Sequence, residues 1–175
     1  MSAAALTRTR YLTGTAVAVG LSVLLPVMVH LLPLSGHVPA GARLLPIFYA
    51  PLLGVLLGRP AAALTAALLA PLLNHLLTGM PAPSLLPTMT TELVLFSGLA
   101  LLLAKRPHLA FLAPLAWLAA HYLAPSLLGA LSALPGLARF GGATSSALPA
   151  LLATAWPGML VLAIIGWAAG RWGRR

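Results

Sequence analysis

The stretch from Ala42 to Pro81 reads ARLLPIFYAPLLGVLLGRPAAALTAALLAPLLNHLLTGMP, and it decides the fold. Two apolar runs stand back to back in it, joined by the short turn Gly58-Arg59-Pro60. Leucine and alanine alone are enough to build a membrane hairpin. The polar side chains gather at the end opposite the turn, with Arg43 on one run and Asn74-His75 on the other. This segregation indicates that something is bound at that end of the hairpin.

The composition of the whole chain is that of a membrane protein. Of its 175 residues, 61% are hydrophobic and 6% are charged, which leaves too few polar residues to cover a soluble globule. A spanning helix needs about 20 apolar residues, and the chain has room for about six. We predict an all-α integral membrane protein, a single polytopic domain over residues 1–175, with helices at roughly 11–32, 44–57, 61–77, 90–104, 109–128 and 148–170.

The basic residues indicate the orientation of these helices. On an alternating six-helix path, Arg43 and Arg139 fall on one side, and the other basic residues fall on the opposite side: Arg8, Arg10, Arg59, Lys105, Arg106, Arg171, Arg174 and Arg175. Cytoplasmic loops carry the excess of Lys and Arg, so we expect both termini to be cytoplasmic. A nucleic-acid-binding protein would instead cluster its basic side chains on a solvated face among aromatics.

The start of the chain permits a competing interpretation as a secretory signal. Ala40-Gly41-Ala42 resembles a cleavage site for signal peptidase. The apolar segment before it is longer than the usual signal core of about 7–15 residues, and further membrane helices follow. We therefore expect the first helix to be retained in the membrane.

Several kinds of chemistry are excluded by what the sequence lacks. It has no cysteine, no Asp, one Glu and no GxxxxGK[ST] motif, so it offers no thiolate chemistry and no ATP site of that type. It also lacks GxSxG and HExxH motifs and paired carboxylates, so we expect neither an enzyme nor a resident cofactor. The histidines lack the spacing of metal ligands on one helix, so a metal site would have to be assembled from His30, His37, His75, His121 and Glu92.

Polar side chains lie near the outer ends of the predicted helices, whereas the inner halves are almost entirely Leu, Ala, Val and Gly. A channel or proton relay would need polar groups through the whole thickness of the membrane. The pattern instead predicts a cup open to the outside above a dry floor. Its candidate members are His30, His37, Arg43, Tyr49, Asn74, His75, Thr78, Thr88, Thr90, Thr91, Glu92, His121, Tyr122 and residues 144–146.

Glu92 is the single acidic residue, and an ionisable group in a spanning helix is a functional-site hypothesis because its burial is costly. Arg43 is the expected partner on the same side. The alternatives are a Glu92–Arg43 clamp that only fixes helix packing, a Glu92 that sits at a helix N-terminus among headgroups, and an Arg43 that extends to headgroups.

Three further candidates have equally simple alternatives. Asn74 and His75 are adjacent, so their side chains point about 100° apart and at most one faces the cup squarely. Either can instead form an interhelical hydrogen bond, worth about 0.6 kcal/mol in a membrane. His121 can be a packing histidine beside Trp117 and Tyr122.

Small residues recur every four positions on three helices. On the first, Gly14 and Ala18 form one register, and Ala16 and Gly20 form a second register. The others are Ala62, Ala66 and Ala70 on the third helix, and Gly166 and Gly170 on the last. Such stripes let helix backbones approach closely, either within the bundle or against a partner protein.

The run from Arg43 to Gly58 and the run from Ala70 to Pro81 resemble the substrate-binding S components of energy-coupling factor (ECF) transporters, and Thr91-Glu92-Leu93 with Gly98 resembles the fourth helix of that family. The resemblance covers about half the chain. It implies a six-helix membrane subunit that captures a water-soluble vitamin or related micronutrient. It also implies three partners, a transmembrane coupling subunit and two cytoplasmic ATPase subunits, and a capture subunit that topples in the membrane to release its solute inward.

The resemblance also assigns positions. The coupling contact of the family carries over to Ala16 and Gly20, with Gly14 and Ala18 as the other register. The family's solute-covering loops correspond to residues 35–42 and 79–87.

For the solute contacts we expect Arg43, Tyr49, Asn74, His75, Thr91, Glu92 and His121. Arg43 suggests a carboxylate or phosphate on the solute, the aromatic residues suggest a ring, and Glu92 suggests an amine or ring N–H. A zwitterionic or mixed-polarity heterocycle would satisfy all three. A self-sufficient small-solute permease and a metal-binding uptake subunit remain alternative functions.

Overall fold

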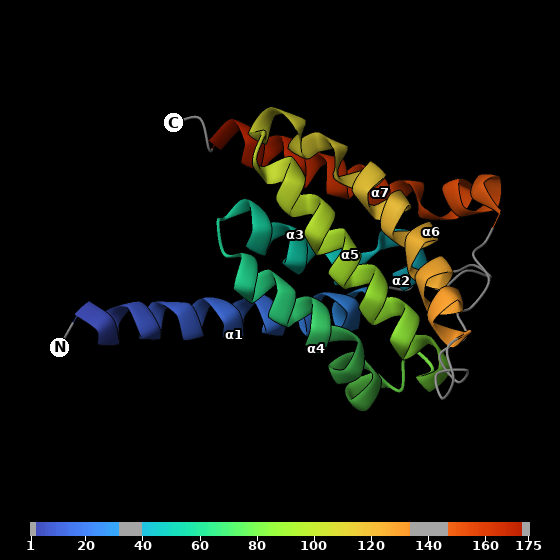
Figure 1. Cartoon of the computed structure of the whole chain (residues 1–175), viewed down its shortest axis with the longest axis horizontal. Coiled ribbons are helices and arrows are strands. Elements are labelled where there is room, and N and C mark those ends of the chain that lie inside the picture. The colour runs from blue at the N-terminus through green and yellow to red at the C-terminus, as the bar shows by residue number, and fades with distance from the viewer. Residues whose placement is uncertain (1–2, 32–39, 134–146, 173–175) are drawn as a thin grey trace.

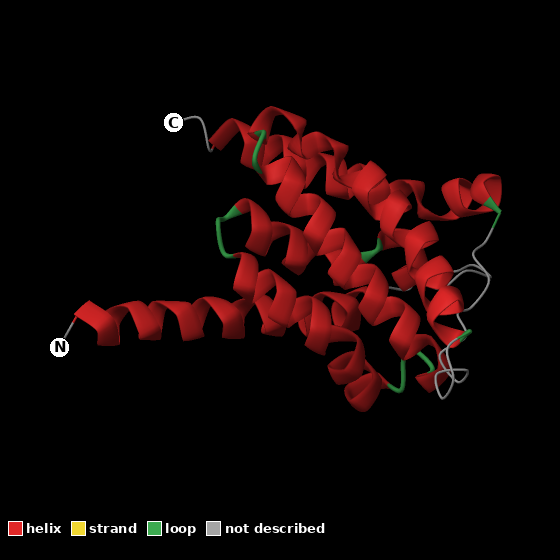
Figure 2. Cartoon of the chain, in the orientation of Figure 1, coloured by secondary structure: helices red, strands yellow, loops and turns green. Residues whose placement is uncertain are grey.

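The computed structural model describes residues 3–31, 40–133 and 147–172, and within these ranges the regular elements are all helices (Figures 1 and 2). The prediction of an all-α membrane protein is confirmed. The elements are α1 (Ala3–His30), α2 (Ala40–Leu44), η1 (Pro46–Phe48), α3 (Tyr49–Leu56), α4 (Pro60–Thr78), η2 (Pro83–Leu85), α5 (Leu86–Ala104), η3 (Pro107–Leu112), α6 (Ala113–Ser132) and α7 (Leu148–Trp172), where η denotes a 3₁₀ helix.

In the described part of the chain, five segments are long and apolar enough to cross a membrane, not the six that we predicted. They are Leu12–Val29, Pro60–Thr78, Pro83–Ala104, Pro107–Ser132 and Leu148–Arg171. The segment predicted at 44–57 is the short apolar helix Pro46–Leu56. At about 1.5 Å per residue, it covers only about half of a 30 Å hydrocarbon core.

The backbone around Leu45 explains why this segment is short. A residue that precedes proline is driven out of the right-handed helical region, and Pro46 has no N–H to continue a helix. Leu45 accordingly has φ 54° and ψ 38°, in the left-handed region, and α2 ends there. At its other end, α3 stops before Gly58, which also has a positive φ, of 70°.

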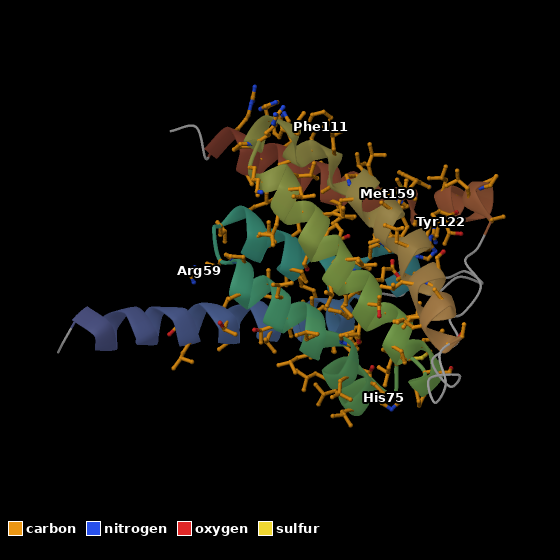
Figure 3. All side chains as sticks on the ribbon, viewed as in Figure 1. Arg59, His75, Phe111, Tyr122 and Met159 are labelled. Carbon is orange, nitrogen blue, oxygen red and sulfur yellow. The ribbon has the colours of Figure 1, made fainter. Side chains whose placement is uncertain are left out.

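The bundle has two distinct ends (Figure 1). α1 begins, α7 ends, and the α3–α4 and α5–η3 connections all lie at the left in that view. We call this the basic end, because Arg59, Lys105, Arg106 and Arg171 belong to these segments; Arg59 is labelled there in Figure 3. The described helix starts and ends therefore place the basic residues together, as the alternating path predicted.

Small residues allow α7 to lie directly on its neighbours at several points along its length. A Cβ added to Gly158 would come within 2.7 Å of the Leu44 backbone, and one added to Gly166 or Gly170 would collide with a carbonyl oxygen of η3. The stripe predicted at Gly166 and Gly170 therefore serves packing within the chain. Leu162, on the same face of α7, is fully buried.

Large apolar side chains cover the outside of the bundle. Leu72 and Leu76 on α4, Leu123 on α6, and Leu160 and Ile164 on α7 are all exposed. A soluble monomer rarely exposes apolar surface on this scale, whereas hydrocarbon lipid tails solvate it without cost. The outer surface therefore fits a multi-pass membrane protein.

Candidate functional site

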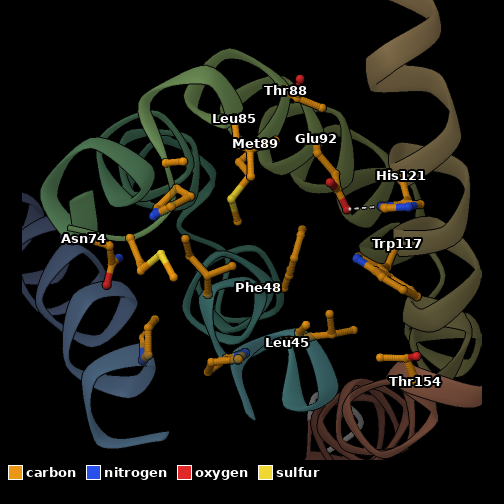
Figure 4. A pocket seen from close by; sticks show the side chains of 18 of the residues that line it. Leu45, Phe48, Asn74, Leu85, Thr88, Met89, Glu92, Trp117, His121 and Thr154 are labelled. Atoms are coloured by element: carbon orange, nitrogen blue, oxygen red, sulfur yellow. Dashed lines mark hydrogen bonds and ion pairs between the residues drawn. The ribbon is translucent and has the colours of Figure 1, made fainter. Parts of the chain in front are cut away.

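A cavity of about 690 Å³ opens among the helices at the end opposite the basic end, which we call the pocket end (Figure 4). Five long helices contribute to its wall, together with η1 and the segments around Gly41 and Met80. Its volume is in the range of small-molecule sites. The cup predicted from the sequence therefore has a counterpart in the fold.

The broken segment around Leu45 forms one wall of this cavity. Leu45, Pro46, Ile47 and Phe48 all line it. In a membrane, backbone that leaves the regular helix is tolerated where it borders a cavity or is buried in protein. The short second segment therefore contributes irregular backbone to the cavity wall.

Aromatic rings stand together in this wall. Phe48 lies 5.3 Å from Phe96 and 6.3 Å from Trp117 between ring centroids, both in edge-to-face geometry. All three side chains are buried. Phe48 and Trp117 line the cavity itself, and the fixed edge-to-face contacts hold them in place there.

Glu92 forms an ion pair across two helices in the wall. His121 Nδ1 on α6 lies 3.1 Å from Glu92 Oε1 on α5, and both residues line the cavity (Figure 4). Our expectation that Arg43 is the partner of Glu92 is wrong, because among the described residues the salt bridge of Glu92 is with His121. α5 and α6 pack side by side, which brings the two side chains to the same depth, whereas Arg43 is in the last turn of α2.

Three polar atoms in the wall are buried and lack a hydrogen-bond partner within the described protein. They are Asn74 Oδ1, Trp117 Nε1 and His121 Nε2, and each belongs to a residue that lines the cavity. An unsatisfied buried polar group costs about 1–3 kcal/mol. Three such atoms around one cavity indicate hydrogen-bonding capacity reserved for a molecule that enters it.

The hydrogen bonds of Asn74 show how one of these three atoms is held in place. Its Nδ2 donates to Ser22 O on α1 at 3.0 Å and to Ala70 O in its own helix at 2.8 Å. Both amide hydrogens are therefore used, and the side chain is 3% exposed. The carbonyl oxygen is left as a free acceptor in a fixed orientation.

His75 has a different role from its neighbour. Its Nδ1 lies 2.9 Å from Pro81 O, and the residue is absent from the cavity lining, whereas Pro81 is part of it. Thr78 Oγ1 donates to Asn74 O at 2.7 Å. As expected for adjacent residues, Asn74 faces the cavity, and His75 instead fastens the segment after α4.

Besides His75, three predicted contact residues lie outside the lining. Arg43 and Thr91 are half-buried but do not line the cavity. The hydroxyl of Tyr49 donates to Leu44 O, and its side chain packs against the apolar core. Thr88, one helical turn before Glu92, lines the cavity in place of Thr91.

Two polar side chains of the wall were not predicted from the sequence. Trp117 was considered only as a packing neighbour of His121, although the spacing of four residues on one helix already placed the two on the same face. Thr154 on α7 was not considered at all, since a lone threonine in an apolar helix is an ordinary packing residue.

The predicted covering loops are partly visible. Gly41 and Ala42 line the cavity, as do Met80, Pro81 and Leu85. Residues 35–39, and with them His37, lie outside the described residues, as do residues 144–146 and the side chain of His30. For a metal, the described residues contain no group of three His, Cys, Asp or Glu side chains that could hold an ion.

The two registers of small residues on α1 have different surroundings. Gly14 and Ala18 are buried: the Arg59 guanidinium lies over Gly14, and Ala18 packs with Ala62 and Ala66 of α4. Ala16 and Gly20 are exposed. Within the chain α4 covers the first register, so the second is the one open to lipid or to another protein.

Comparisons with known proteins add no relative. No protein-family model, no curated protein and no solved structure matches the chain. Its function is therefore argued from the site itself.

Proposed function

We propose that the chain is a solute-capturing membrane subunit of an importer, of the kind that its resemblance to ECF S components implies. The observation that carries this proposal is the cavity at the pocket end, with three buried polar atoms that lack partners around it. These atoms carry a desolvation cost that a bound solute can remove, which is how a capture site gains affinity.

The rest of the bundle supports capture over conduction. The buried polar side chains of the described chain are Ser22, Asn74, Glu92 and Ser97. Ser22 and Ser97 bond to carbonyls of their own helices, at Val19 and Leu93. No polar path therefore continues from the cavity to the basic end among the described residues, which disfavours a self-sufficient permease.

The partners follow from the same proposal. The coupling subunit would contact the exposed register of α1, Ala16 and Gly20, near the basic end, which we assign to the cytoplasmic side of a bacterial inner membrane. Two ATPase subunits would drive the return of the empty subunit. The cavity would then open to the outside, where a micronutrient is captured.

The first test is tryptophan fluorescence of the detergent-purified chain, titrated with vitamins, their precursors and divalent metals. Of the four tryptophans, Trp117 lines the cavity, whereas Trp156 and Trp167 are exposed on the outer surface. We expect saturable quenching by one organic compound, unaffected by a chelator and lost in Trp117→Phe. A response to metal alone would favour the metal-binding alternative.

The second test separates a capture subunit from a permease. Uptake of the compound identified above is measured in cells that express the chain alone, with the coupling module, or with a module whose ATPases cannot hydrolyse ATP. We expect uptake only with the active module. Equal uptake by the chain alone would overturn the proposed function.

A further inference from the structure

The charges around the cavity restrict what it can bind. Among the described lining residues, the ionisable side chains are Glu92 and His121, and neither Lys nor Arg is present. His121 is already paired with the Glu92 carboxylate. An anionic solute would therefore be buried beside the Glu92 carboxylate, and the wall would offer no Lys or Arg to pair with it. Burying such an unpaired charge costs binding free energy.

The hydrogen-bonding groups of the wall are mostly acceptors. Glu92 Oε1 accepts from His121 Nδ1, so the carboxylate is one acceptor of the wall. Asn74 Oδ1 is a second acceptor, since the amide hydrogens of that residue are spent on Ser22 O and Ala70 O. Trp117 Nε1 is an unpaired buried donor. The Asn74 oxygen and the Glu92 carboxylate can accept hydrogen bonds and the indole can only donate, so the wall favours a solute that presents N–H groups.

The apolar part of the wall indicates the shape. Phe48 and Trp117 hold aromatic rings at the cavity, while Leu45 and Met89 supply aliphatic surface. Aromatic side chains prefer offset or edge-to-face contact with another ring. A flat ring compound can therefore use this wall and still reach the polar atoms.

We infer that the cavity binds a planar, nitrogen-containing ring compound that presents N–H donors and carries no negative charge. This ligand class rests on the proposed capture function and narrows it. It also replaces the expectation, drawn from Arg43, that the solute carries a carboxylate or phosphate. Asn74 and Glu92 would accept hydrogen bonds from the compound, and Trp117 would donate one to it.

Charge-matched probe pairs test the inference on the purified full-length chain. The pairs are uracil with orotate, nicotinamide with nicotinate, and thiamine with thiamine monophosphate, so each acidic probe retains the ring of its partner. Affinity is measured by Trp117 quenching and by thermal shift. We expect at least one neutral or cationic probe to bind about tenfold or more tightly than its acidic partner.

Two variants sharpen the result. Glu92→Gln keeps the size of the side chain but removes its charge, and it should reduce the preference for thiamine over its phosphate ester about tenfold. Arg43→Gln is the matched control, because Arg43 does not line the cavity, and it should leave the preference unchanged. Thermal unfolding of each variant shows whether it folds, and if Glu92→Gln does not, the probe pairs on the unaltered chain still decide.

Two outcomes would overturn the inferred class: equal or tighter binding of the acidic probes, and no binding of any neutral or cationic probe at millimolar concentration. Binding of acidic probes would leave the capture function standing. Conversely, uptake without any ATPase module would remove the capture function and leave the ligand class intact.

Discussion

The two ends of this bundle use the same apolar composition in opposite ways. At the basic end, α7 lies against η3 so closely that Gly166 and Gly170 face backbone carbonyls of Ala110 and Pro107. At the pocket end, the helices stand around a cavity of about 690 Å³. Small residues close the first end, whereas a broken helix and aromatic rings keep the second open.

The two ends also differ in how they affect the stability of the protein. At the basic end, Gly166 and Gly170 leave no space for a Cβ between α7 and η3. At the pocket end, three buried polar atoms have no partner in the described protein. Each such atom lowers stability in a low-dielectric interior, which is a cost that functional sites commonly carry. Substitutions at the basic end should therefore change stability, and those at the pocket end should change binding.

The largest effect should follow from placing a larger side chain in the α7–η3 contact at the basic end. In Gly166→Leu the new Cβ would collide with the Ala110 carbonyl, so we expect the protein to lose about 3 kcal/mol of stability or to misassemble. Gly98→Ala on α5 is the control, because a Cβ there meets nothing within 4 Å, and it should be neutral or slightly stabilising. Thermal unfolding in detergent measures both. Equal stability of the two variants would contradict the close packing described for α7.

The next largest effect should follow from removing the charge of Glu92 at the pocket end. Glu92→Gln should weaken solute binding at least tenfold, or about 1.4 kcal/mol, because it removes the carboxylate that accepts from His121 and faces the cavity. Titration of the best-binding probe by fluorescence gives the affinity. An unchanged affinity in a folded Glu92→Gln variant would move the site away from this residue.

Trp117→Phe tests the unpaired indole donor. Phenylalanine retains much of the ring but loses Nε1, so we expect affinity to fall by about 1 kcal/mol, or roughly fivefold. Because the reporting tryptophan is removed, binding is measured by thermal shift. Trp156→Phe is the control, since Trp156 is exposed on the outer surface. This variant should bind the solute with the affinity of the unaltered chain. A loss of the same size in the control would point to a general effect on folding.

A smaller change should come from the residue that fastens the covering segment. His75→Ala removes the contact with Pro81 O, and a hydrogen bond of this kind contributes about 0.6 kcal/mol in membrane proteins. We expect about threefold weaker binding through faster solute release, measured by stopped-flow fluorescence. A loss as large as that of Glu92→Gln would instead indicate direct contact between His75 and the solute.

The smallest effect should be at Arg43. Its side chain is absent from the cavity lining and from the salt bridges of the described residues, so Arg43→Gln should leave affinity within a factor of about two. Isothermal titration with the same probe provides the measurement. A tenfold loss of affinity would indicate that Arg43 contacts the solute and would favour an anionic solute.

The fold class and the ends of the bundle could be predicted because they depend on local properties. Apolar length follows from composition, and the segregation of Arg59, Lys105 and Arg106 from Arg43 is a property of the order along the chain. The polar cup was also predictable in part: Asn74, Glu92 and His121 lie near the predicted outer helix ends, and all three line the cavity.

The sequence by itself thus determined an all-helical membrane chain and the end at which its polar groups gather. Only the tertiary structure decided that Glu92 pairs with His121, that Trp117 joins the wall, and that Ala16 and Gly20 stay exposed. The physical reason is that these features depend on which helices are neighbours and on how each is rotated about its axis. A nearly uniform run of Leu and Ala fixes neither, because many of its faces pack almost equally well in lipid.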